Sequence, residues 1–306
     1  MAVISPPMKS GPRLLDYWSL LRPRQWTKNL FVFPAALFGL AHVGVSGLDV
    51  ARLLLAFVGF CLISSFVYVL NDILDVRSDG LHPKKRHRPI ANGRVSRGAA
   101  FALASGLFAL AIVAGFSVGH AFTWTLFGYV LNSFLYLLLL KERVIADVLA
   151  IALGFMLRIF GGAAAAGVEP TSWLAVCGFS LALFLGFCKR RSEINCYESE
   201  EVAAEVRVVF RSYTKAKLDV LVGVMAAVTI VTYMMFTVSP DTVRLHGTTS
   251  LIYTSPFVVY CVLRFLMKSL EQKGEDAAET LFMDSGFLAA GVGWAIAVVW
   301  ILSHAT

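Results

Sequence analysis

Residues 53–79 read LLLAFVGFCLISSFVYVLNDILDVRSD, an apolar run that ends directly in an acidic cluster. Residues 53–70 carry no charged side chain. A helix of this length rises about 27 Å, close to the roughly 30 Å of hydrocarbon in a bilayer. The stretch therefore predicts a helix that crosses a membrane and places carboxylates at one of its ends.

The composition agrees with a chain that crosses the membrane many times. Of 306 residues, 58% are hydrophobic and 15% are charged, and the mean hydropathy is +0.71. These values argue against a soluble, disordered or disulfide-stapled protein. The apolar runs are continuous rather than alternating, which argues against a porin-type barrel. The cysteines lack metal-ligand spacing and are expected to be packing residues: Cys61, Cys177, Cys188, Cys196 and Cys261.

The fold class predicted from these runs is an all-α polytopic membrane protein with nine spans in a single membrane domain, residues 1–306. The first residues carry two prolines and charges where a signal peptide needs an apolar core, so we expect no cleaved leader. The nine predicted spans are residues 29–48, 53–70, 99–118, 122–140, 148–167, 172–188, 218–238, 250–267 and 285–303.

The basic residues predict the orientation of these spans. Nearly all of the 27 lysines and arginines lie in the N-terminal arm, residues 1–28, or in the even-numbered loops. Since short cytoplasmic loops carry most Lys and Arg, the N-terminus is expected in the cytoplasm and the C-terminus outside. The loops 71–98 and 189–217 then face the cytoplasm together. The net charge of +7 is a signal of sidedness, and no nucleic-acid-binding module is present.

The acidic cluster is the densest group of chemical residues. If the helix continues past residue 70, Asp72, Asp75 and Asp79 stand at i, i+3 and i+7 on one face, next to Asn71. Three carboxylates so close together would repel one another, and a hard divalent cation relieves the repulsion. Mg²⁺ prefers a few carboxylates together with phosphate oxygens and water. The alternative is a solvated helix end with incidental acids, which is less common where a membrane span ends.

A basic strip follows the acids at once. It contains Lys84, Lys85, Arg86 and Arg88. Acids that hold a metal, next to cations that hold the remaining oxygens, form the arrangement that binds a diphosphate. The alternative is a patch that sets topology or contacts anionic lipid.

The segment from Asn71 to Asp79 resembles the NDxxDxxxD signature of the UbiA superfamily of intramembrane prenyltransferases. Weaker similarity extends through residues 21–29, through residues 136–141 and to Asp147. The resemblance implies about nine helices, Mg²⁺ as cofactor and an active site that opens to the cytoplasm.

The sequence departs from that superfamily after the sixth span. Typical members carry a second aspartate-rich motif there, whereas this chain has Lys189, Arg190 and Arg191 with one acid, Glu193. Such a stretch suits an additional phosphate monoester better than a second metal cluster. The alternative is that these cations only anchor the helix at the lipid headgroups.

This second pattern resembles the decaprenyl-phosphate phosphoribosyltransferase branch of the superfamily. The branch transfers 5-phosphoribose from phosphoribosyl pyrophosphate to a polyprenyl phosphate and releases pyrophosphate, during synthesis of a lipid-linked arabinofuranose donor. The resemblance implies a bacterial plasma-membrane enzyme and extends weakly to residues 274–276 and Asp284. It implies these substrate-binding residues: Arg22, Gln25, Lys28, Asn29, Lys85, Arg86, Arg88, Tyr136, Lys141, Asp147, Arg158, Lys189, Arg190 and Glu193.

Some of these roles stay open. Arg158 lies deep in the fifth span and about 16 Å from Asp147, so the two cannot pair, and a structural role for it is as reasonable as a functional one. Tyr136 and Lys141 are either substrate contacts at the mouth or interfacial anchors. Gly154, Gly161 and Gly162 are expected to allow close helix packing.

Two other functions compete with this one. The first is an aromatic prenyltransferase of the same fold, which uses a prenyl diphosphate and a small aromatic acceptor. The second is a cation-coupled transporter with Asp72, Asp75 and Asp79 as its ion site, although such sites lie near the membrane midplane. The length of the lipid acceptor and the oligomeric state, a homo-oligomer included, stay open.

Overall fold

The structure is a computed structural model that describes residues 13–38, 49–81, 85–271 and 284–305, and all regular secondary structure in these ranges is helical. The longer helices are α3 (Val50–Leu74), α5 (Arg97–Val118), α6 (His120–Leu135), α7 (Ala146–Ala166), α8 (Ser172–Ile194), α10 (Lys215–Val238), α12 (Ser255–Glu271) and α14 (Ser285–Ser303). The shorter elements are α1 (Leu14–Leu21), η1 (Pro23–Val32), α4 (Val76–Leu81), η2 (Lys85–His87), η3 (Tyr136–Leu140), α9 (Glu200–Val206), η4 (Val208–Arg211), α11 (Pro240–His246) and η5 (Ser250–Thr254).

Eight helical segments within the described residues are long and apolar enough to cross a membrane. They correspond to eight of the nine spans predicted from the sequence. Much of the remaining predicted span, residues 29–48, lies outside the described residues, and the part from Asn29 to Val32 belongs to the 3₁₀ helix η1. The all-helical membrane class is therefore confirmed.

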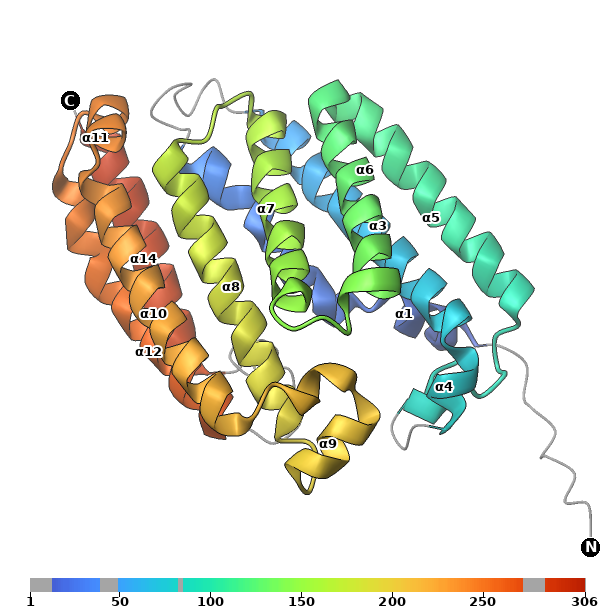
Figure 1. Cartoon of the computed structure of the whole chain (residues 1–306). Coiled ribbons are helices and arrows are strands. Elements are labelled where there is room, and N and C mark those ends of the chain that lie inside the picture. The colour runs from blue at the N-terminus through green and yellow to red at the C-terminus, as the bar shows by residue number, and fades with distance from the viewer. Residues whose placement is uncertain (1–12, 39–48, 82–84, 272–283, 306) are drawn as a thin grey trace, which may run out of the picture.

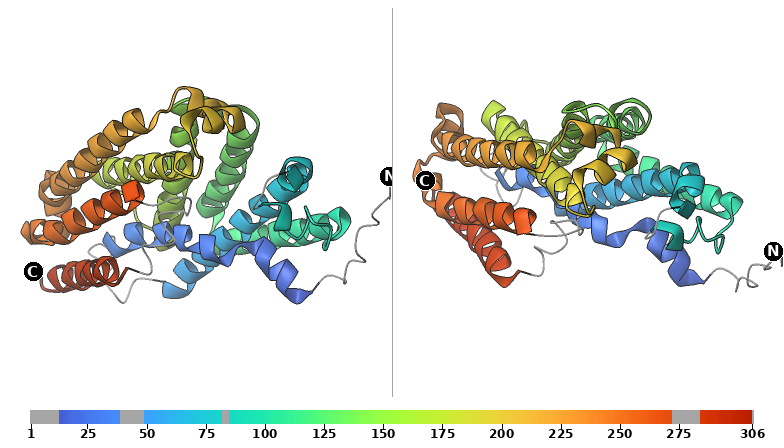
Figure 2. Two further views of the ribbon diagram at one scale, coloured as in Figure 1. Left: turned by 90° about the horizontal axis from the view of Figure 1, so that it is seen from below. Right: turned by 60° about the horizontal axis from the view of Figure 1, so that its bottom comes forward.

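The helices form two groups that meet at α7 and α8. Helix α3 packs against α5, and α6 packs against α7, while α8 packs against α10 and α10 against α12. Figures 1 and 2 show α10, α12 and α14 on the side of the molecule away from α3 and α5. Since α7 also contacts α8, the two groups are joined through the middle of the bundle.

The outer surface of the bundle is apolar. Large hydrophobic side chains are exposed on α5 (Phe101 and Phe116), on α6 (Trp124) and on α14 (Ile296 and Trp300). A soluble protein rarely exposes so much contiguous apolar surface, whereas acyl chains cover it at no cost. The spans therefore present their outward faces to lipid.

The short helices that follow the predicted polar motifs lie at one end of the bundle. Figure 1 places α4 and α9 together at the lower end, while α11 lies at the upper end near the C-terminus. Loops that the sequence assigns to one compartment thus lie at one end of the molecule. We refer to that end as the polar end.

Two helices continue past the span ends predicted from the sequence. Helix α3 extends to Leu74 and α8 to Ile194, so Asn71 to Leu74 and Lys189 to Ile194 are helical rather than loop. Two of the charges in the last turns of α8, Arg190 and Arg191, pair with carboxylates of neighbouring helices. Arg191, for example, pairs with Asp219 of α10.

Candidate active site

A cavity of about 890 Å³ begins at the polar end and continues between the helices. Eight cationic side chains and one acidic side chain line it among the described residues. The acid is Glu193, and the cations are Arg22, Lys28, Lys85, Arg88, Arg158, Lys189, Arg190 and Arg207. Aspartates outside the lining pair with Arg22, Arg88 and Arg190. The positive charge that remains in this low-dielectric enclosure attracts a ligand that carries several negative charges.

The rest of the cavity is apolar. Its lining includes Phe31 and Phe155 on one side and Phe236, Phe265 and Trp294 on the other. These side chains come from both groups of helices, so the apolar part lies between them. A ligand that fills the whole space must be anionic at one end and hydrophobic along the rest.

Two arginines at the polar end form ion pairs with the acidic cluster. Arg22 donates from Nη2 to Asp72 Oδ1 at 2.5 Å, and Arg88 donates from Nη1 to the same oxygen at 3.0 Å. Arg88 Nη1 also contacts Asp79 Oδ2 at 2.6 Å. Both carboxylates are 3% exposed, so each depends on these cations for neutralisation.

The continuous ladder of three acids predicted from the sequence is interrupted. Helix α3 ends at Leu74, and α4 starts at Val76 after Asp75, whose backbone leaves the helical region at φ −89° and ψ 9°. Asp72 and Asp79 consequently converge on one nitrogen, and no group of three potential ligands occurs within the described residues.

The carboxylates of Asp72 and Asp79 suit a magnesium ion. Two carboxylates already converge on a positive charge, and Asn71, which lines the cavity, adds an amide oxygen. Hard divalent cations prefer such oxygen donors together with phosphate oxygens. Asp72, Asp79 and Asn71 are therefore the residues that suit the ion.

The segment before the first predicted span is fastened to α3. Trp26 donates from its indole Nε1 to Ser65 Oγ at 3.1 Å, and Ser65 donates to the Leu21 carbonyl oxygen at 2.8 Å. The guanidinium of Arg22 also lies 4.8 Å from the ring centre of Tyr68. These contacts hold Arg22 beside Asp72.

Gln25, Lys28 and Asn29 follow in the same segment. Lys28 lines the cavity and donates from Nζ to Gln25 Oε1 at 2.5 Å. Asn29 is fully buried, and its amide donates to Cys61 Sγ at 3.2 Å and to Ser64 Oγ at 3.4 Å. Only Lys28 of these three lines the cavity.

A buried network at the end of α8 surrounds Arg190. Its Nε donates to Asp147 Oδ2 at 2.6 Å, its Nη1 to Glu193 Oε2 at 2.5 Å and its Nη2 to Tyr136 Oη at 2.9 Å. The Arg190 side chain is 1% exposed and Asp147 is 0% exposed. Three of the five N–H groups of Arg190 are thus used within the protein.

Two expectations change because of this network. Asp147, which the resemblance implies as a substrate-binding residue, is fully buried and pairs with Arg190, a cation of the predicted loop 189–217. Arg190 lines the cavity, yet its contacts fit a residue that ties α7, α8 and η3 together. Lys189, the preceding residue, lines the cavity as well.

Arg207 is a site residue that sequence reasoning missed. It follows α9 and donates to Glu193 Oε1 at 2.8 Å, to Tyr136 Oη at 3.0 Å and to the Lys141 carbonyl oxygen at 3.2 Å. Burial and the neighbouring Arg190 lower its pKa, but Glu193 and Tyr136 outweigh them, so the net pKa is raised. No motif surrounds Arg207; its position in a cytoplasmic-type loop was the one available signal.

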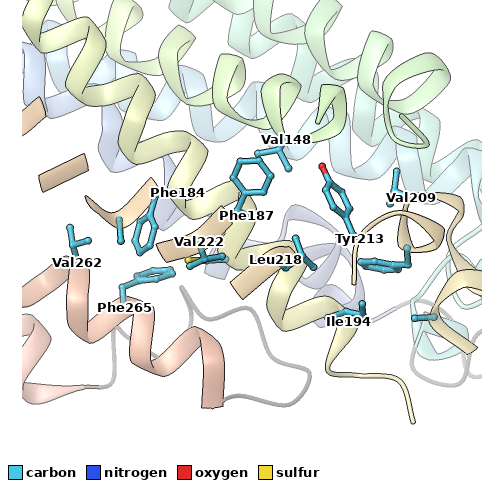
Figure 3. Packing of buried hydrophobic residues seen from close by; sticks show 14 residues of the cluster. Val148, Phe184, Phe187, Ile194, Val209, Tyr213, Leu218, Val222, Val262 and Phe265 are labelled. Carbon is cyan, nitrogen blue, oxygen red and sulfur yellow. The ribbon is translucent and has the colours of Figure 1, made fainter. Parts of the chain in front are cut away.

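An apolar cluster fixes the segment that carries Arg207. Figure 3 shows Val209, Tyr213 and Ile194 packed with side chains of α8, α10 and α12. The Tyr213 hydroxyl donates to Asp147 Oδ1 at 3.0 Å and accepts from the backbone N–H of Ile145 at 2.6 Å. Burial raises the pKa of Tyr213 to about 12, so this hydroxyl stays protonated at neutral pH.

The other predicted residues divide between the cavity and the surface. Lys85 and Arg88 line the cavity, while Arg86 is exposed and contacts the ring of His87 at 3.4 Å. Lys141 takes part through its backbone oxygen. Residues 82–84 and 274–276 lie outside the described residues.

Arg158 lies deep in the cavity and has neutral partners. It donates to Asn29 Oδ1 at 2.7 Å, to the Gly154 carbonyl oxygen at 2.7 Å and to Tyr129 Oη at 3.2 Å. The same helix approaches η1 very closely, since a Cβ added at Gly162 would lie 1.8 Å from the Val32 carbonyl oxygen. The expected packing role of Gly162 is consistent with this contact.

Residues 32–303 match the model of the UbiA prenyltransferase family. The chain belongs to this family. The match covers all eight described spans, both polar motifs and most of the cavity lining, whereas the lining residues Arg22, Thr27, Lys28 and Phe31 precede it.

Curated relatives within the UbiA family carry a more specific name. A decaprenyl-phosphate phosphoribosyltransferase from Corynebacterium glutamicum is 33% identical over 71% of this chain and 65% of its own length. The enzyme of the same name from Mycolicibacterium smegmatis is 34% identical over 72% of this chain and 70% of its own length. The aligned region thus spans about two thirds of each relative.

Solved UbiA structures share the fold. A UbiA homologue from Archaeoglobus fulgidus bound to GPP and Mg²⁺ has a TM-score of 0.69, with 93% of this chain and 99% of that chain covered. The sequence identity is 17%, so this likeness establishes the architecture alone.

Proposed function

We propose that this UbiA-family transferase moves 5-phosphoribose from phosphoribosyl pyrophosphate to a polyprenyl phosphate, with Mg²⁺, and releases pyrophosphate. The observation that carries the proposal is the lining of the cavity, where eight cations face one carboxylate. Two phosphorylated substrates bring far more negative charge to the site than a single prenyl diphosphate and an aromatic acceptor would.

The relatives support the same reaction. Both the corynebacterial and the mycolicibacterial proteins are named for it, at 33% and 34% identity. The charged segment after the predicted sixth span is consistent with the reaction for which these relatives are named. In this segment Lys189 and Arg207 line the cavity together with Glu193. A phosphate monoester suits such a cationic pair better than a second metal ion does.

Asp72 and Asp79, with Asn71, would hold the magnesium ion at the polar end. When bound there, Mg²⁺ neutralises charge that develops on the pyrophosphate leaving group. Arg22 and Arg88 contact these acids. Their guanidinium groups are then next to the leaving group and can donate to its oxygens.

The remaining steps need no general base from the protein. The phosphate oxygen of the lipid acceptor is already anionic and attacks C1 of the ribose from the face opposite the leaving group, so the configuration at C1 inverts. The residues of the chain orient both substrates and exclude water. The apolar part of the cavity, around Phe236 and Trp294, suits the isoprenoid chain.

The basic loops suggest the compartment that the polar end faces. We propose that the polar end faces the cytoplasm of a bacterial cell, where phosphoribosyl pyrophosphate is soluble and the basic loops are retained. The single domain of residues 1–306 would then lie in the plasma membrane with its mouth at the inner surface.

Prenyl transfer to an aromatic acceptor is the second candidate. The long apolar part of the cavity favours it, because a prenyl diphosphate would also fit there. The single carboxylate of the second motif, Glu193, speaks against it. The two reactions differ in the donor that the protein binds.

The test is mass spectrometry of lipids after the purified protein is incubated with phosphoribosyl pyrophosphate, Mg²⁺ and a polyprenyl phosphate. We expect a new lipid heavier by one phosphoribosyl group, which disappears in Asp72→Asn and persists in Asp241→Asn. Asp241 is a matched control because it lies on α11 at the far end and is exposed. A product formed only from geranyl diphosphate and an aromatic acid would overturn the proposal.

A further inference from the structure

Arg158 lies in the middle of α7, far from the polar motifs. It follows Asp147, at the start of the helix, by eleven residues, or about 16 Å of helix rise. Its side chain lines the cavity and the residue is 5% exposed. A permanent positive charge therefore faces the cavity at a depth where the hydrogen-bond partners around it carry no charge.

The partners of Arg158 are all neutral. They are the side-chain oxygen of Asn29, the carbonyl oxygen of Gly154 and the hydroxyl of Tyr129. The ring of Tyr129 also lies 4.6 Å from the guanidinium carbon, and that of Phe155 lies 5.7 Å from it. These contacts orient the group but do not neutralise its charge.

The other buried arginines differ in this respect. Arg190 pairs with Asp147 and Glu193, and Arg191 pairs with Asp219. Among the three arginines that are buried in the described ranges, Arg158 alone has no carboxylate within ion-pair distance. A buried charge without a counter-ion costs stability, so such a residue inside a membrane protein points to a function.

The geometry leaves donors for an anion. A guanidinium has five N–H groups, and three are used by Asn29, Gly154 and Tyr129. One N–H remains on each terminal nitrogen, which is the fork that binds two oxygens of a phosphate. The side chain is held in place because Asn29 is itself fixed by Cys61 and Ser64 of α3.

We propose that Arg158 forms a second anion site in the cavity, separate from the aspartates, and that it binds a phosphate monoester of a substrate. The inference rests on the proposed function, which supplies two such groups, the ribose 5-phosphate and the lipid phosphate. The site would set how far the phosphorylated end of that substrate enters the bundle. Arg158 thereby replaces Arg190, whose charge is neutralised by Asp147 and Glu193, as a phosphate ligand.

The experiment measures binding to the purified full chain in detergent, by calorimetry and by ligand-induced thermal stabilisation. The probes are ribose 5-phosphate, farnesyl phosphate, and pyrophosphate with Mg²⁺. In Arg158→Gln we expect affinity for one of the two monoesters to fall by about tenfold or more, since a hydrogen-bonded charge is lost. Affinity for pyrophosphate with Mg²⁺ should change less than about twofold, because that probe binds at Asp72 and Asp79.

The two monoester probes identify which substrate supplies the phosphate. A loss confined to ribose 5-phosphate assigns the site to the sugar donor, and a loss confined to farnesyl phosphate assigns it to the lipid acceptor. Arg244→Gln, an exposed arginine on α11, serves as control and should bind all probes as the unchanged protein does. Equal monoester affinities in Arg158→Gln and the unchanged protein, or no monoester binding by either, would overturn the inference.

Stability without ligand separates this role from a structural one. Removing a charge that no residue neutralises should leave the melting temperature of Arg158→Gln equal or higher. A fall in melting temperature with unchanged ligand-induced shifts would show that Arg158 only supports packing. If Arg158→Gln fails to fold, Arg158→Lys keeps the charge but loses the fork, and it should still weaken monoester binding several-fold.

The failure of the proposed function is a separate outcome. If the unchanged protein shows no response to phosphoribosyl pyrophosphate or to pyrophosphate with Mg²⁺, the phosphoribosyl reaction fails. If it responds to both and Arg158→Gln matches it for every probe, only the assignment of Arg158 fails.

Discussion

Asp147 and Arg190, separated by 43 residues in the chain, form an ion pair of 2.6 Å in which neither side chain is exposed by more than 1%. The pair joins the start of α7 to the end of α8. It therefore fixes the part of the bundle that carries Lys189 and Glu193. These two residues are correctly positioned only while the ion pair is formed.

Asp147→Asn should destabilise the protein strongly. Removing one partner of a buried ion pair leaves the other charge uncompensated, which costs about 3–5 kcal/mol. Thermal or denaturant unfolding in detergent measures the loss. Asp241→Asn, which breaks the exposed pair with Arg244, should cost about 0–1 kcal/mol. Similar losses in the two variants would show that the Asp147 pair does not carry the packing.

Asp72→Asn should reduce turnover by about 10²-fold or more, because a group that stabilises the leaving group is lost. The lipid-product assay measures the rate, and Asp241→Asn provides the unchanged control. Removal of divalent cations by a chelator should abolish turnover, and added Mg²⁺ should restore it. Full activity in the presence of chelator would contradict the metal-binding role of Asp72 and Asp79.

Arg207→Met should raise KM for the phosphoribosyl donor by about tenfold, with a smaller change in kcat, since a charged hydrogen bond to phosphate is lost. Steady-state kinetics of pyrophosphate release measure both constants. Arg211→Met is a matched control because Arg211 lies on the adjacent η4 and is exposed. If kcat and the melting temperature fell while KM stayed unchanged, Arg207 would have a supporting role only.

Tyr213→Phe should change the stability of the protein at alkaline pH. The folded pKa of about 12 lies above the ordinary value of 10, so the hydroxyl contributes stability below pH 10 that is lost as the pH rises toward 12. Melting temperatures measured from pH 8 to pH 12 should show this loss in the unchanged protein. The curve of Tyr213→Phe should start lower and be flatter over the same interval.

Gly162→Ala should destabilise the contact between α7 and η1. The added Cβ would lie 1.8 Å from the Val32 carbonyl oxygen, and backbone cannot move away as a side chain can. We expect a loss of about 1–3 kcal/mol or more in unfolding free energy. Gly106→Ala, on α5 where no atom lies within 4 Å, should be neutral or stabilising. A neutral Gly162→Ala would mean that η1 is not packed tightly on α7.

The sequence predicted the helical membrane class and most span positions because the thickness of the bilayer sets the length of apolar helix needed to cross it. The bounds agree within a few residues for the helix over Arg97–Val118 and for the helix over Ser285–Ser303. The predicted end of α8 was wrong by six residues, since it ended the helix at residue 188, before the charged positions. Hydropathy cannot show that Arg190 and Arg191 find carboxylate counter-ions on other helices.

The sequence predicted those parts of the candidate site whose residues are close together in the chain. It did not predict contacts between residues that are far apart in the chain. Asp72 and Asp79 belong to one short motif, so their proximity follows from their closeness in sequence, although the helix breaks at Asp75 between them. Arg207 lies 14 residues beyond Glu193 and 71 beyond Tyr136 and contacts both, a distance in sequence that no motif records.

By itself, the sequence determined that the chain lies in a membrane, which segments cross it and that acids and bases gather at the ends of spans. These properties depend on each segment alone, through its length, hydropathy and charge. Only the tertiary structure decided which charges neutralise each other and which face the cavity. Arg190 and Arg158 have the same side chain, and only the packing of other helices gives one of them two carboxylates and the other none.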